Sequence, residues 1–349
     1  MEAQGMRSLI SNELRSSADT IASIDAGMIE RIADVLVEVI KNGNKVIFMG
    51  NGGSSADASH LAAEFTGRYL MERAPMPAIT LSNIAPVTAI GNDYSFDTVF
   101  KRQTEAYAVK GDAAICISTS GNSKNIIEAM KAAKEKGAIT ISFTGSGGIM
   151  KDMADHALII PSKETPRIQE GYMVAGHTIC GLTERGVFGK KAVFIDRDDT
   201  IAKDVPYCSR PEDMKLFNGV PKSIAKLNKA GYLVIIITNQ SGVSRGKFTT
   251  EDLERIHKKM YADIEKEGGK IDDLFYCPHH PDEKCGCRKP EAGMGIAAVN
   301  KYKINTKASF MIGNSDADVE FGRSIGCASI KVTEKFTFND AVEQILKSG

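Results

Sequence analysis

A short polar stretch, CPHHPDEKCGCRKP at residues 277–290, concentrates side chains that bind metal ions. It contains two ligand pairs separated by a loop of five residues: Cys277, His279, Cys285 and Cys287. Three thiolates and one imidazole make a closed tetrahedral ligand set for structural Zn²⁺. His280 competes with His279 by position, and a disulfide or free thiols are the alternative interpretation. The spacing favours zinc.

Two carboxylates two residues apart follow a strand-like run in VFIDRDDT, residues 193–200. Carboxylates act as nucleophiles and proton carriers in enzymes. Aspartate is also common in turns, so Asp196 and Asp198 alone are weak grounds for an active site. Three further stretches follow them along the chain: IIITNQSGVSRG, CRKP and MIGNSDADVEFG.

The first half of the chain contains two glycine- and serine-rich turns, GNGGSSADASH at residues 50–60 and STSGNS at residues 118–123. Each follows a predicted strand and opens a helix, where glycines allow close approach of a ligand and free N–H groups favour an anion. A single such turn is as easily a tight connection. Two at the carboxyl ends of strands in one sheet indicate a ligand site.

Two pairs of polar residues lie on the predicted helices of this half. His60 and Glu64 are four residues apart and share a helix face. Gln169 and His177 lie on roughly the same side of a helix predicted from about Arg167 to Phe188. The alternative is a surface Glu–His pair and a core histidine.

The elements that must position these residues are strands that alternate with helices, and this alternation occurs once in each half of the chain. Two helices are predicted between Leu9 and Asn42. The predicted strands are KVIFMG, PAITLS, DAAICISTS, AITISFTG and HALIIPS in the first half, and KAVFID, YLVIIITN, LFYCP, SFMIGN and ASIKV in the second. Strands that alternate with helices form parallel sheets covered on both faces. We therefore expect two doubly wound α/β domains in series, residues 1–188 and 190–349, with a boundary near Gly189.

The composition of the 349-residue chain is balanced, with 44 basic and 44 acidic residues and 42% hydrophobic residues. No net charge attracts nucleic acid or an anionic membrane, so neither is expected as a partner. The N-terminus lacks the apolar run of a signal peptide, and the aliphatic runs are too short for a membrane span. Seven cysteines, an odd number, suit a reducing cytoplasm.

With GND at residues 91–93 and RIQEGYMVAGH at 167–177, the motifs of residues 1–188 resemble the sedoheptulose-7-phosphate isomerase family of sugar-isomerase domains. The resemblance implies a zinc site made of His60, Glu64, Gln169 and His177. It implies substrate contacts from Asn51, Gly52, Gly53, Asn92, Asp93, Ser118, Thr119, Ser120, Ser123 and Gln169, with the phosphate on the STSGNS turn. Glu64 and His177 are then the acid–base pair, and a homo-oligomer, a tetramer, is expected through this domain.

The second half resembles the haloacid dehalogenase superfamily, and most nearly its histidinol-phosphate and heptose-bisphosphate phosphatase branch. The resemblance makes Asp196 the nucleophile and Asp198 the acid and base. Thr238 and Lys289 would hold the phosphoryl group, and Asn239, Arg245 and Arg288 would contact substrate. Mg²⁺ would be bound by Asp196, Asp198 and Asn314, and Zn²⁺ by the loop of Cys277, His279, Cys285 and Cys287.

Two positions depart from the family pattern. Asp199 stands where a glycine is usual. Asn314 replaces a metal-binding aspartate, which keeps an oxygen ligand but removes a charge, while Asp318 is retained and Asp316 lies near.

The expected function is a cytoplasmic, bifunctional enzyme of heptose biosynthesis that acts on sugar phosphates. The first domain would convert sedoheptulose 7-phosphate to D-glycero-D-manno-heptose 7-phosphate. The second would remove the C7 phosphate of the 1,7-bisphosphate, after a separate kinase has phosphorylated C1. The alternatives are a sugar-phosphate sensor in the first domain and, in the second, a histidinol-phosphate-type phosphatase or a zinc-stabilised scaffold without catalysis.

Overall fold

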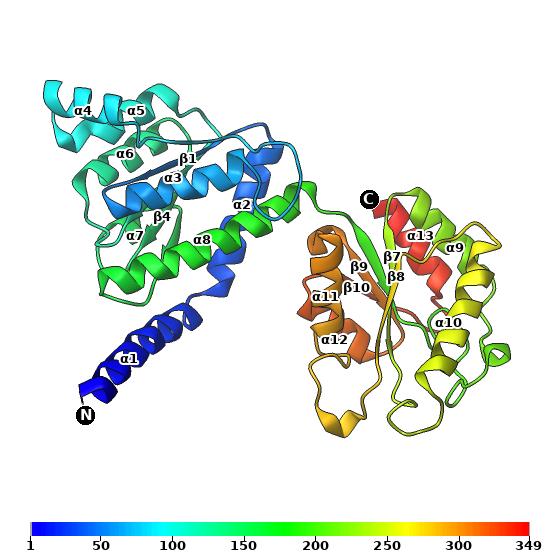
Figure 1. The fold of residues 1–349 in the computed structure, drawn as a ribbon. Coiled ribbons are helices and arrows are strands. Elements are labelled where there is room, and N and C mark those ends of the chain that lie inside the picture. Colours follow the sequence, from blue (N-terminus) through cyan, green and yellow to red (C-terminus); the bar gives the residue numbers. More distant parts are fainter. Residues whose placement is uncertain (1, 349) are drawn as a thin grey trace. The chain divides into compact units, whose positions relative to one another are not determined.

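A computed structural model describes residues 2–348, and the side chains of residues 5–347. The chain divides into two compact units between Val187 and Phe188. Each unit contains one five-stranded sheet in which all strands run parallel (Figure 1).

The sheet of the first domain has the strand order β2-β1-β3-β4-β5. Its strands are β1 (Val46–Gly50), β2 (Ala78–Thr80), β3 (Ala113–Ser118), β4 (Ile139–Thr144) and β5 (His156–Ile159). Its helices are α1 (Glu2–Ala22), α2 (Ala26–Lys41), α3 (Gly53–Thr66), α4 (Ile84–Asp93), α5 (Val99–Tyr107), α6 (Lys124–Glu135), α7 (Met150–Met153) and α8 (Thr165–Phe188), with a short 3₁₀ turn η1 (Phe96–Thr98).

Alternate residues of β1 enter two different cores, because successive side chains of a strand point to opposite faces. Ile47 and Met49 pack in a cluster with residues of α5 and α6. Phe48, on the other face, meets Phe65 of α3 edge to face. All five residues of β1 are buried, as expected for a strand covered on both sides.

The sheet of the second domain has the order β10-β9-β6-β7-β8. Its strands are β6 (Ala192–Ile195), β7 (Leu233–Asn239), β8 (Asp273–Cys277), β9 (Phe310–Gly313) and β10 (Ala328–Lys331). Its helices are α9 (Val220–Lys229), α10 (Thr250–Glu265), α11 (Gly293–Tyr302), α12 (Asp316–Ser324) and α13 (Phe338–Ser348), with 3₁₀ turns η2 (Pro211–Asp213), η3 (Pro281–Glu283) and η4 (Thr306–Ala308).

Two cores again lie on either side of the central strand β6. Val193 and Ile195 belong to a cluster with residues of α9, α10 and α13. Ala192 and Phe194 face the opposite cluster, which contains residues of α11 and α12. Every one of the ten predicted strands is present, so the predicted fold class of two parallel α/β domains is confirmed.

Among the described residues, no helix combines the length and the apolar character that crossing a membrane requires. None of the seven cysteines, all of which are described, forms a disulfide.

A buried carboxylate joins the edges of β1 and β3. Asp112, whose side chain has no exposed surface, accepts hydrogen bonds from Lys45 Nζ at 2.6 Å, Val109 N at 2.9 Å and Asn44 Nδ2 at 3.2 Å. Burial by itself would raise the pKa of Asp112, but the bonds from Lys45, Val109 and Asn44 outweigh it, so the pKa is lowered.

We expect Asp112→Asn to lower the free energy of unfolding of the first domain by about 1–3 kcal/mol at pH 7, because buried donors lose an ionised acceptor. A carboxylate with a lowered folded pKa stabilises the fold above its unfolded pKa of about 4 and loses that effect as the pH falls through the folded pKa. Urea unfolding followed by circular dichroism at pH 7 and at low pH measures the difference. An equal difference between wild type and variant at both pH values would contradict the assignment.

Candidate active sites

Three of the four predicted zinc ligands of the first domain lie together. His60 and Glu64 come from α3, and His177 comes from α8. His60 Nε2 is 2.9 Å from His177 Nε2 and 3.5 Å from Glu64 Oε1. All three side chains can place one ligand atom within 4.8 Å of the others. Two imidazoles and one carboxylate are the donor set of many catalytic zinc sites, which keep a fourth position open, so these residues fit Zn²⁺.

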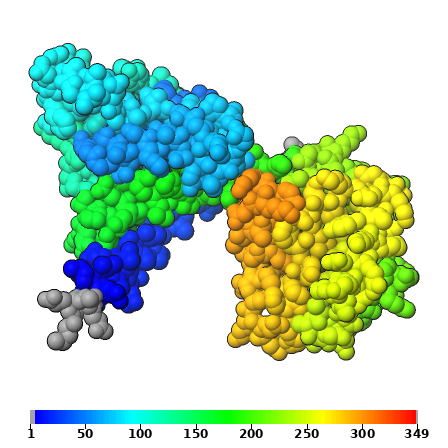
Figure 2. Space-filling view, in the orientation of Figure 1, coloured from blue at the N-terminus to red at the C-terminus, as the bar shows by residue number. Residues whose placement is uncertain are grey.

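The three side chains meet because α3 and α8 pack closely. They are also accessible, because α3 lies at the surface of the domain. A Cβ on Gly176 of α8 would come within 2.9 Å of the Leu61 side chain of α3, so the glycine permits the close approach. Figure 2 shows α3, in mid blue, on the surface of the first domain, and the side chain of His60 is 50% exposed. A ligand can therefore reach the cluster from solvent.

Gln169, the fourth predicted ligand, lies elsewhere on α8. It precedes His177 by eight residues, which is roughly 12 Å along a helix axis. Its Nε2 donates to Asp57 Oδ2 at 3.2 Å, and a Cβ on Gly53 would come within 2.5 Å of it. No contact among the described residues joins Gln169 to His60, Glu64 or His177. It lies instead at the first glycine-rich turn, beside the predicted substrate contacts.

The two glycine-rich turns follow β1 and β3, which are neighbours in the sheet. They are tied together by a reciprocal pair of amide bonds between Asn51 and Asn125, each at 2.9 Å. Gly52 has a φ of 52°, a left-handed conformation that glycine adopts without strain. The predicted residues Asn51, Gly52 and Gly53 therefore lie next to the start of α6.

Serine hydroxyls line the second turn. Ser118 Oγ lies 2.9 Å from Ser123 Oγ and 3.4 Å from Ser120 Oγ, and Thr119 lies between them in the chain. They stand at the N-terminus of α6, where unpaired backbone N–H groups attract an anion. Asn92 and Asp93, at the end of α4, bond to each other at 2.9 Å and make no contact with these serines among the described residues.

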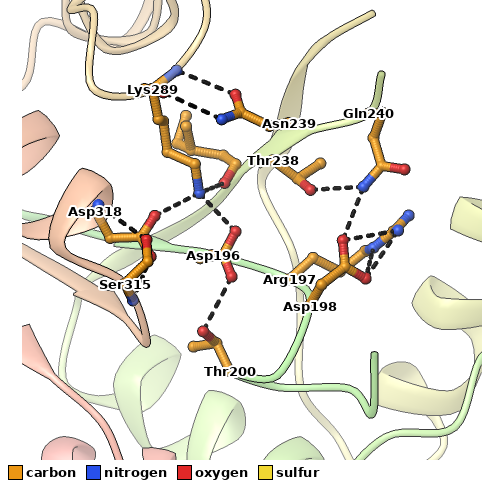
Figure 3. Close-up of polar contacts among 11 residues, drawn as sticks. Asp196, Arg197, Asp198, Thr200, Thr238, Asn239, Gln240, Lys289, Ser315 and Asp318 are labelled. Carbon is orange, nitrogen blue, oxygen red and sulfur yellow. Dashed lines mark hydrogen bonds and ion pairs between the residues drawn. The ribbon is translucent and has the colours of Figure 1, made fainter. Parts of the chain in front are cut away.

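The second domain places a buried lysine between two carboxylates, which Figure 3 shows. Lys289 Nζ lies 2.5 Å from Asp196 Oδ1, 2.6 Å from Asp318 Oδ1 and 2.9 Å from the carbonyl oxygen of Ile237. Burial alone would lower the pKa of Lys289, but the two carboxylates outweigh it and the pKa is raised. Two of its N–H groups donate, to Asp196 Oδ1 and to the carbonyl oxygen of Ile237, and the contact with Asp318 is an ion pair, so the ammonium is fixed and charged.

Asp196 follows β6, and Thr200 Oγ1 donates to its other oxygen at 3.0 Å. Burial raises the pKa of Asp196, the charge of Lys289 opposes this, and the carboxylate of Asp318 adds to it. One oxygen faces Lys289 and the other faces Thr200, so the carboxylate is held in a single orientation (Figure 3).

Asp198 has different partners, although it is only two residues away. Its carboxylate accepts from Nε and Nη2 of Arg197, each at 2.9 Å, and from Gln240 Nε2 at 2.9 Å. Arg197 is buried and its Nη1 lies 3.4 Å from His257 Nε2, which must accept because arginine has no acceptor. Burial and then the charge of Arg197 lower the pKa of His257 to about 3, so the imidazole is neutral.

The last two residues of β7 and the residue after it support this centre. Gln240 Nε2 donates to Thr238 Oγ1 at 2.8 Å, which leaves the hydroxyl hydrogen of Thr238 for another acceptor. Asn239 accepts from Lys289 N at 3.0 Å and donates to Lys289 O at 3.2 Å. Asn239 was predicted to contact substrate; in the structure both ends of its amide hold the backbone of Lys289.

The turn after β9 carries the substitution at Asn314. Asp318 is buried, and accepts from Ser315 Oγ at 2.6 Å as well as pairing with Lys289. Asp316 is 89% exposed and pairs with Lys331 at 2.7 Å. Both neighbouring carboxylates therefore already have cationic partners.

The two predicted arginine contacts differ in burial. Arg245 is exposed on the loop between β7 and α10. Arg288 is partly buried, and its Nη1 makes no hydrogen bond among the described residues. Asp199 has a φ of 52°, which explains why glycine is usual there, and its side chain accepts from Asp204 N at 2.8 Å.

The predicted zinc loop brings its four ligands together. The sulfur atoms lie 3.3–3.5 Å apart, and His279 Nδ1 lies 3.2 Å from Cys287 Sγ and 3.5 Å from Cys277 Sγ. A disulfide needs about 2.05 Å. Ligands at about 2.3 Å around one tetrahedral ion would lie roughly 3.7 Å apart, slightly more than observed. His280 is occupied instead as the cap of η3, where it accepts from Asp282 N.

Several residues at these sites were not predicted. Asp57 orients Gln169, Asn125 pairs with Asn51, and Arg197 and Gln240 hold Asp198. Arg197 and Gln240 lie inside the motifs quoted from the sequence, next to predicted residues, and that adjacency was the available signal. Asp57 also lies inside a quoted motif, GNGGSSADASH, whereas Asn125 becomes recognisable only from the packing.

Comparison with known proteins matches each half separately. Residues 11–145 match the model described as SIS domain, and residues 191–340 match the model described as polynucleotide kinase 3 phosphatase. A phosphoheptose isomerase of Aliarcobacter butzleri is 49% identical over 184 residues, 51% of this chain and 97% of that protein.

Two solved structures are also similar to parts of the chain. The phosphoheptose isomerase of Neisseria gonorrhoeae is 35% identical, with a TM-score of 0.47, over 53% of this chain and 99% of that one. The D,D-heptose 1,7-bisphosphate phosphatase of B. bronchiseptica, complexed with magnesium and phosphate, is 30% identical, with a TM-score of 0.43, over 46% of this chain and 99% of that one.

The zinc loop gives a direct test. We expect Cys285→Ser to lose the zinc that wild type retains after mild chelation, about one ion per chain, because a closed four-ligand site exchanges slowly. The second domain should also unfold at lower urea concentration, since the loop leads directly into Lys289. Elemental analysis and urea unfolding measure both. Cys208→Ser, outside the loop, is the control and should keep its zinc; equal zinc content in both variants would contradict the ligand assignment.

Proposed function

The chain belongs to the phosphoheptose isomerase family through its first domain, and we propose that this domain interconverts sedoheptulose 7-phosphate and D-glycero-D-manno-heptose 7-phosphate. The observation that carries the proposal is the cluster of His60, Glu64 and His177 in a domain 49% identical to a phosphoheptose isomerase. The sugar phosphate would bind at the STSGNS turn, where the hydroxyls and the N-terminus of α6 suit an anion.

Aldose–ketose isomerisation moves a proton between neighbouring carbons through an enediol. Glu64 takes the proton from the carbon beside the carbonyl group, and His177 gives a proton to the carbonyl oxygen. Glu64 has two carboxylate oxygens and His177 has two ring nitrogens. In each residue one of these atoms can bind the metal while the other carries the proton. Zn²⁺ bound by the cluster would polarise the carbonyl oxygen. Asn51 and Gln169 lie at the first glycine-rich turn and would orient the sugar.

For the second domain we propose hydrolysis of the C7 phosphate of D-glycero-D-manno-heptose 1,7-bisphosphate. Asp196 attacks the phosphorus and the bond to the sugar oxygen breaks, leaving a phosphoryl group on Asp196. Asp198 gives a proton to the departing oxygen, and later takes one from the water that hydrolyses the aspartyl phosphate. Asp198 therefore carries that proton when the substrate binds, and Arg197 and Gln240, which donate to its carboxyl group, hold it in place.

Charge on the transferred group is balanced by fixed donors. The ammonium of Lys289 is already 2.5 Å from the nucleophile, and the hydroxyl hydrogen of Thr238 is available. Mg²⁺ held by Asp196, Asn314 and the backbone carbonyl of Asp198 would offset the remaining negative charge. Arg288, with an unbonded buried Nη1, and the exposed Arg245 are the proposed contacts to the second phosphate.

The two reactions are not consecutive, because the isomerase product carries one phosphate and the phosphatase substrate carries two. A phosphoryl transfer to C1 by a separate kinase must come between them. The chain therefore supplies two steps of one route and depends on another enzyme for the step between.

We further infer a cytoplasmic homo-oligomer, a tetramer, assembled through the first domain. Four exposed apolar residues recur on one face of α1: Met6, Leu9, Ile10 and Leu14. An apolar stripe of this spacing is ordinarily covered by another helix. Seven unpaired cysteines, three of them in the proposed zinc loop, suit a reducing compartment.

Because the two sites lie in separate domains, we expect a mutation in one site to abolish its activity and to leave the other activity intact. His177→Ala should abolish isomerisation of sedoheptulose 7-phosphate and leave bisphosphate hydrolysis largely unchanged, since the domains have separate cores. Asp196→Asn should do the reverse. Assays of both activities on each purified variant measure this. Loss of both activities in either well-folded variant would contradict the assignment.

Asn314 should make hydrolysis unusually dependent on Mg²⁺. At an effective dielectric near 20, one carboxylate charge close to a divalent ion is worth several kcal/mol. Asn314→Asp should therefore lower the Mg²⁺ concentration needed for half-maximal hydrolysis. The control is Asp316→Asn, because Asp316 is exposed and paired with Lys331.

A Mg²⁺ titration of bisphosphate hydrolysis for the three proteins decides the matter. If Asn314→Asp leaves the requirement unchanged, the charge at this position does not govern metal binding. If no protein hydrolyses the bisphosphate, the proposed phosphatase activity is wrong, and the result favours a scaffold or a phosphatase of histidinol-phosphate type.

A further inference from the structure

A fully buried ion pair lies beside the isomerase cluster and has no place in the reaction described above. Arg73 Nε is 2.9 Å from Glu184 Oε1, and the two side chains are 1% and 0% exposed. Burying two charges costs several kcal/mol of desolvation unless further hydrogen bonds satisfy both groups. Backbone groups that satisfy them lie in the C-terminal turn of α3 and in the segment that joins α3 to β2.

Arg73 closes the end of the helix that carries His60 and Glu64. Its Nη2 donates to the carbonyl oxygen of Glu64 at 2.8 Å, and its Nη1 donates to those of Phe65 at 2.8 Å and Gly67 at 3.1 Å. The last carbonyl groups of a helix have no partner within the helix and carry partial negative charge. The guanidinium therefore fixes the C-terminal turn of α3, from which Glu64 projects.

Glu184 fixes the next part of the segment. Its two oxygens accept from the backbone N–H groups of Tyr69 at 3.1 Å and Leu70 at 2.8 Å. Since Glu184 lies on α8, the same helix as His177, these bonds tie the segment to that helix.

The bonds to Glu184 place one aromatic ring against the cluster. The rings of Tyr69 and His177 are parallel within 3°, with centroids 5.7 Å apart. This is an offset stack of the kind that aromatic pairs favour. The His60 ring meets His177 from its edge, at 81° and 5.1 Å. Tyr69 and His60 thus confine the imidazole of His177 from two directions.

A glycine makes room for the ring. A Cβ on Gly181 of α8 would lie 3.2 Å from Tyr69 Cε1, closer than most real contacts of such an atom. Gly181 lies in the middle of a helix of 24 residues, where glycine is unfavourable compared with alanine by about 1 kcal/mol. The glycine thus serves the placement of Tyr69 and not the helix.

We propose that Tyr69, held in place by Glu184 and Arg73, is a positioning residue that fixes the plane of the His177 imidazole for isomerisation. The proposal rests on the proposed isomerase function. The stacked ring prevents rotation of His177 and shields one of its faces, so that Nε2 stays directed at the cluster, 2.9 Å from His60 Nε2. Tyr69 itself transfers no proton and touches no substrate in this account.

The kinetic test uses three variants. Tyr69→Leu removes the ring, Gly181→Ala pushes it away without removing any polar group, and Tyr69→Phe keeps the ring. We expect kcat of isomerisation to fall about tenfold to a hundredfold in the first two, since small displacements of a catalytic group have effects of that size. KM should change little, and Tyr69→Phe should retain wild-type kcat.

The control for folding is urea unfolding of the first domain followed by circular dichroism in each variant, because bisphosphate hydrolysis reports on the second domain alone. Gly181→Ala is informative on stability as well, since alanine favours a helix and a loss of kcat cannot then be ascribed to weakening of α8. Wild-type kcat in both Tyr69→Leu and Gly181→Ala, or an equal loss in Tyr69→Phe, would overturn the proposal.

A second readout does not depend on activity. A ring stacked on His177 shifts the imidazole proton resonances of that residue upfield, and the chain has only six histidines to assign. Tyr69→Leu and Gly181→Ala should move the His177 resonances downfield, whereas Tyr69→Phe should not. If wild type shows no isomerase activity, the proposed function is wrong, but the NMR measurement still tests the contact between Tyr69 and His177. Unchanged His177 shifts in the variants would overturn the positioning role, and moved shifts would support it.

Discussion

Both sites depend on the same constraint, which is that a parallel sheet covered by helices leaves only its strand ends open. Every residue of β1, β3 and β6 is buried, so no ligand can approach these sheets from a face. The side chains at the carboxyl ends of the strands are the ones that can meet solvent and still be fixed by the sheet. The STSGNS turn after β3 and Asp196 after β6 occupy that position in their respective domains.

Charge buried in either domain has to be neutralised where it stands. In the second domain, the ammonium of Lys289 balances the carboxylates of Asp196 and Asp318. In the first domain, Arg73 and Glu184 neutralise each other, and their other hydrogen bonds go to backbone groups. The result in both domains is a rigid arrangement that exists before substrate binds, which is the condition for electrostatic stabilisation of a reaction.

The strands could be read from the sequence because each is a short apolar run bounded by turn residues, and that pattern depends on local order alone. The ligands of the zinc loop could be read for the same reason, since they lie close together in the chain. The family resemblance grouped Gln169 with His177 as zinc ligands, and in the structure Gln169 donates to Asp57 and lies against Gly53 at the glycine-rich turn. Contacts such as Tyr69 on His177 join residues more than a hundred positions apart, and no local pattern signals them.

The central claim is that one chain contains two separate catalysts for heptose phosphates. Phosphorus NMR of the purified wild-type chain tests it directly, with sedoheptulose 7-phosphate in one tube and D-glycero-D-manno-heptose 1,7-bisphosphate in another. We expect a new sugar-phosphate resonance without inorganic phosphate in the first tube, and inorganic phosphate with a sugar 1-phosphate in the second. Unchanged spectra in either tube, or release of the C1 phosphate in the second, would contradict it.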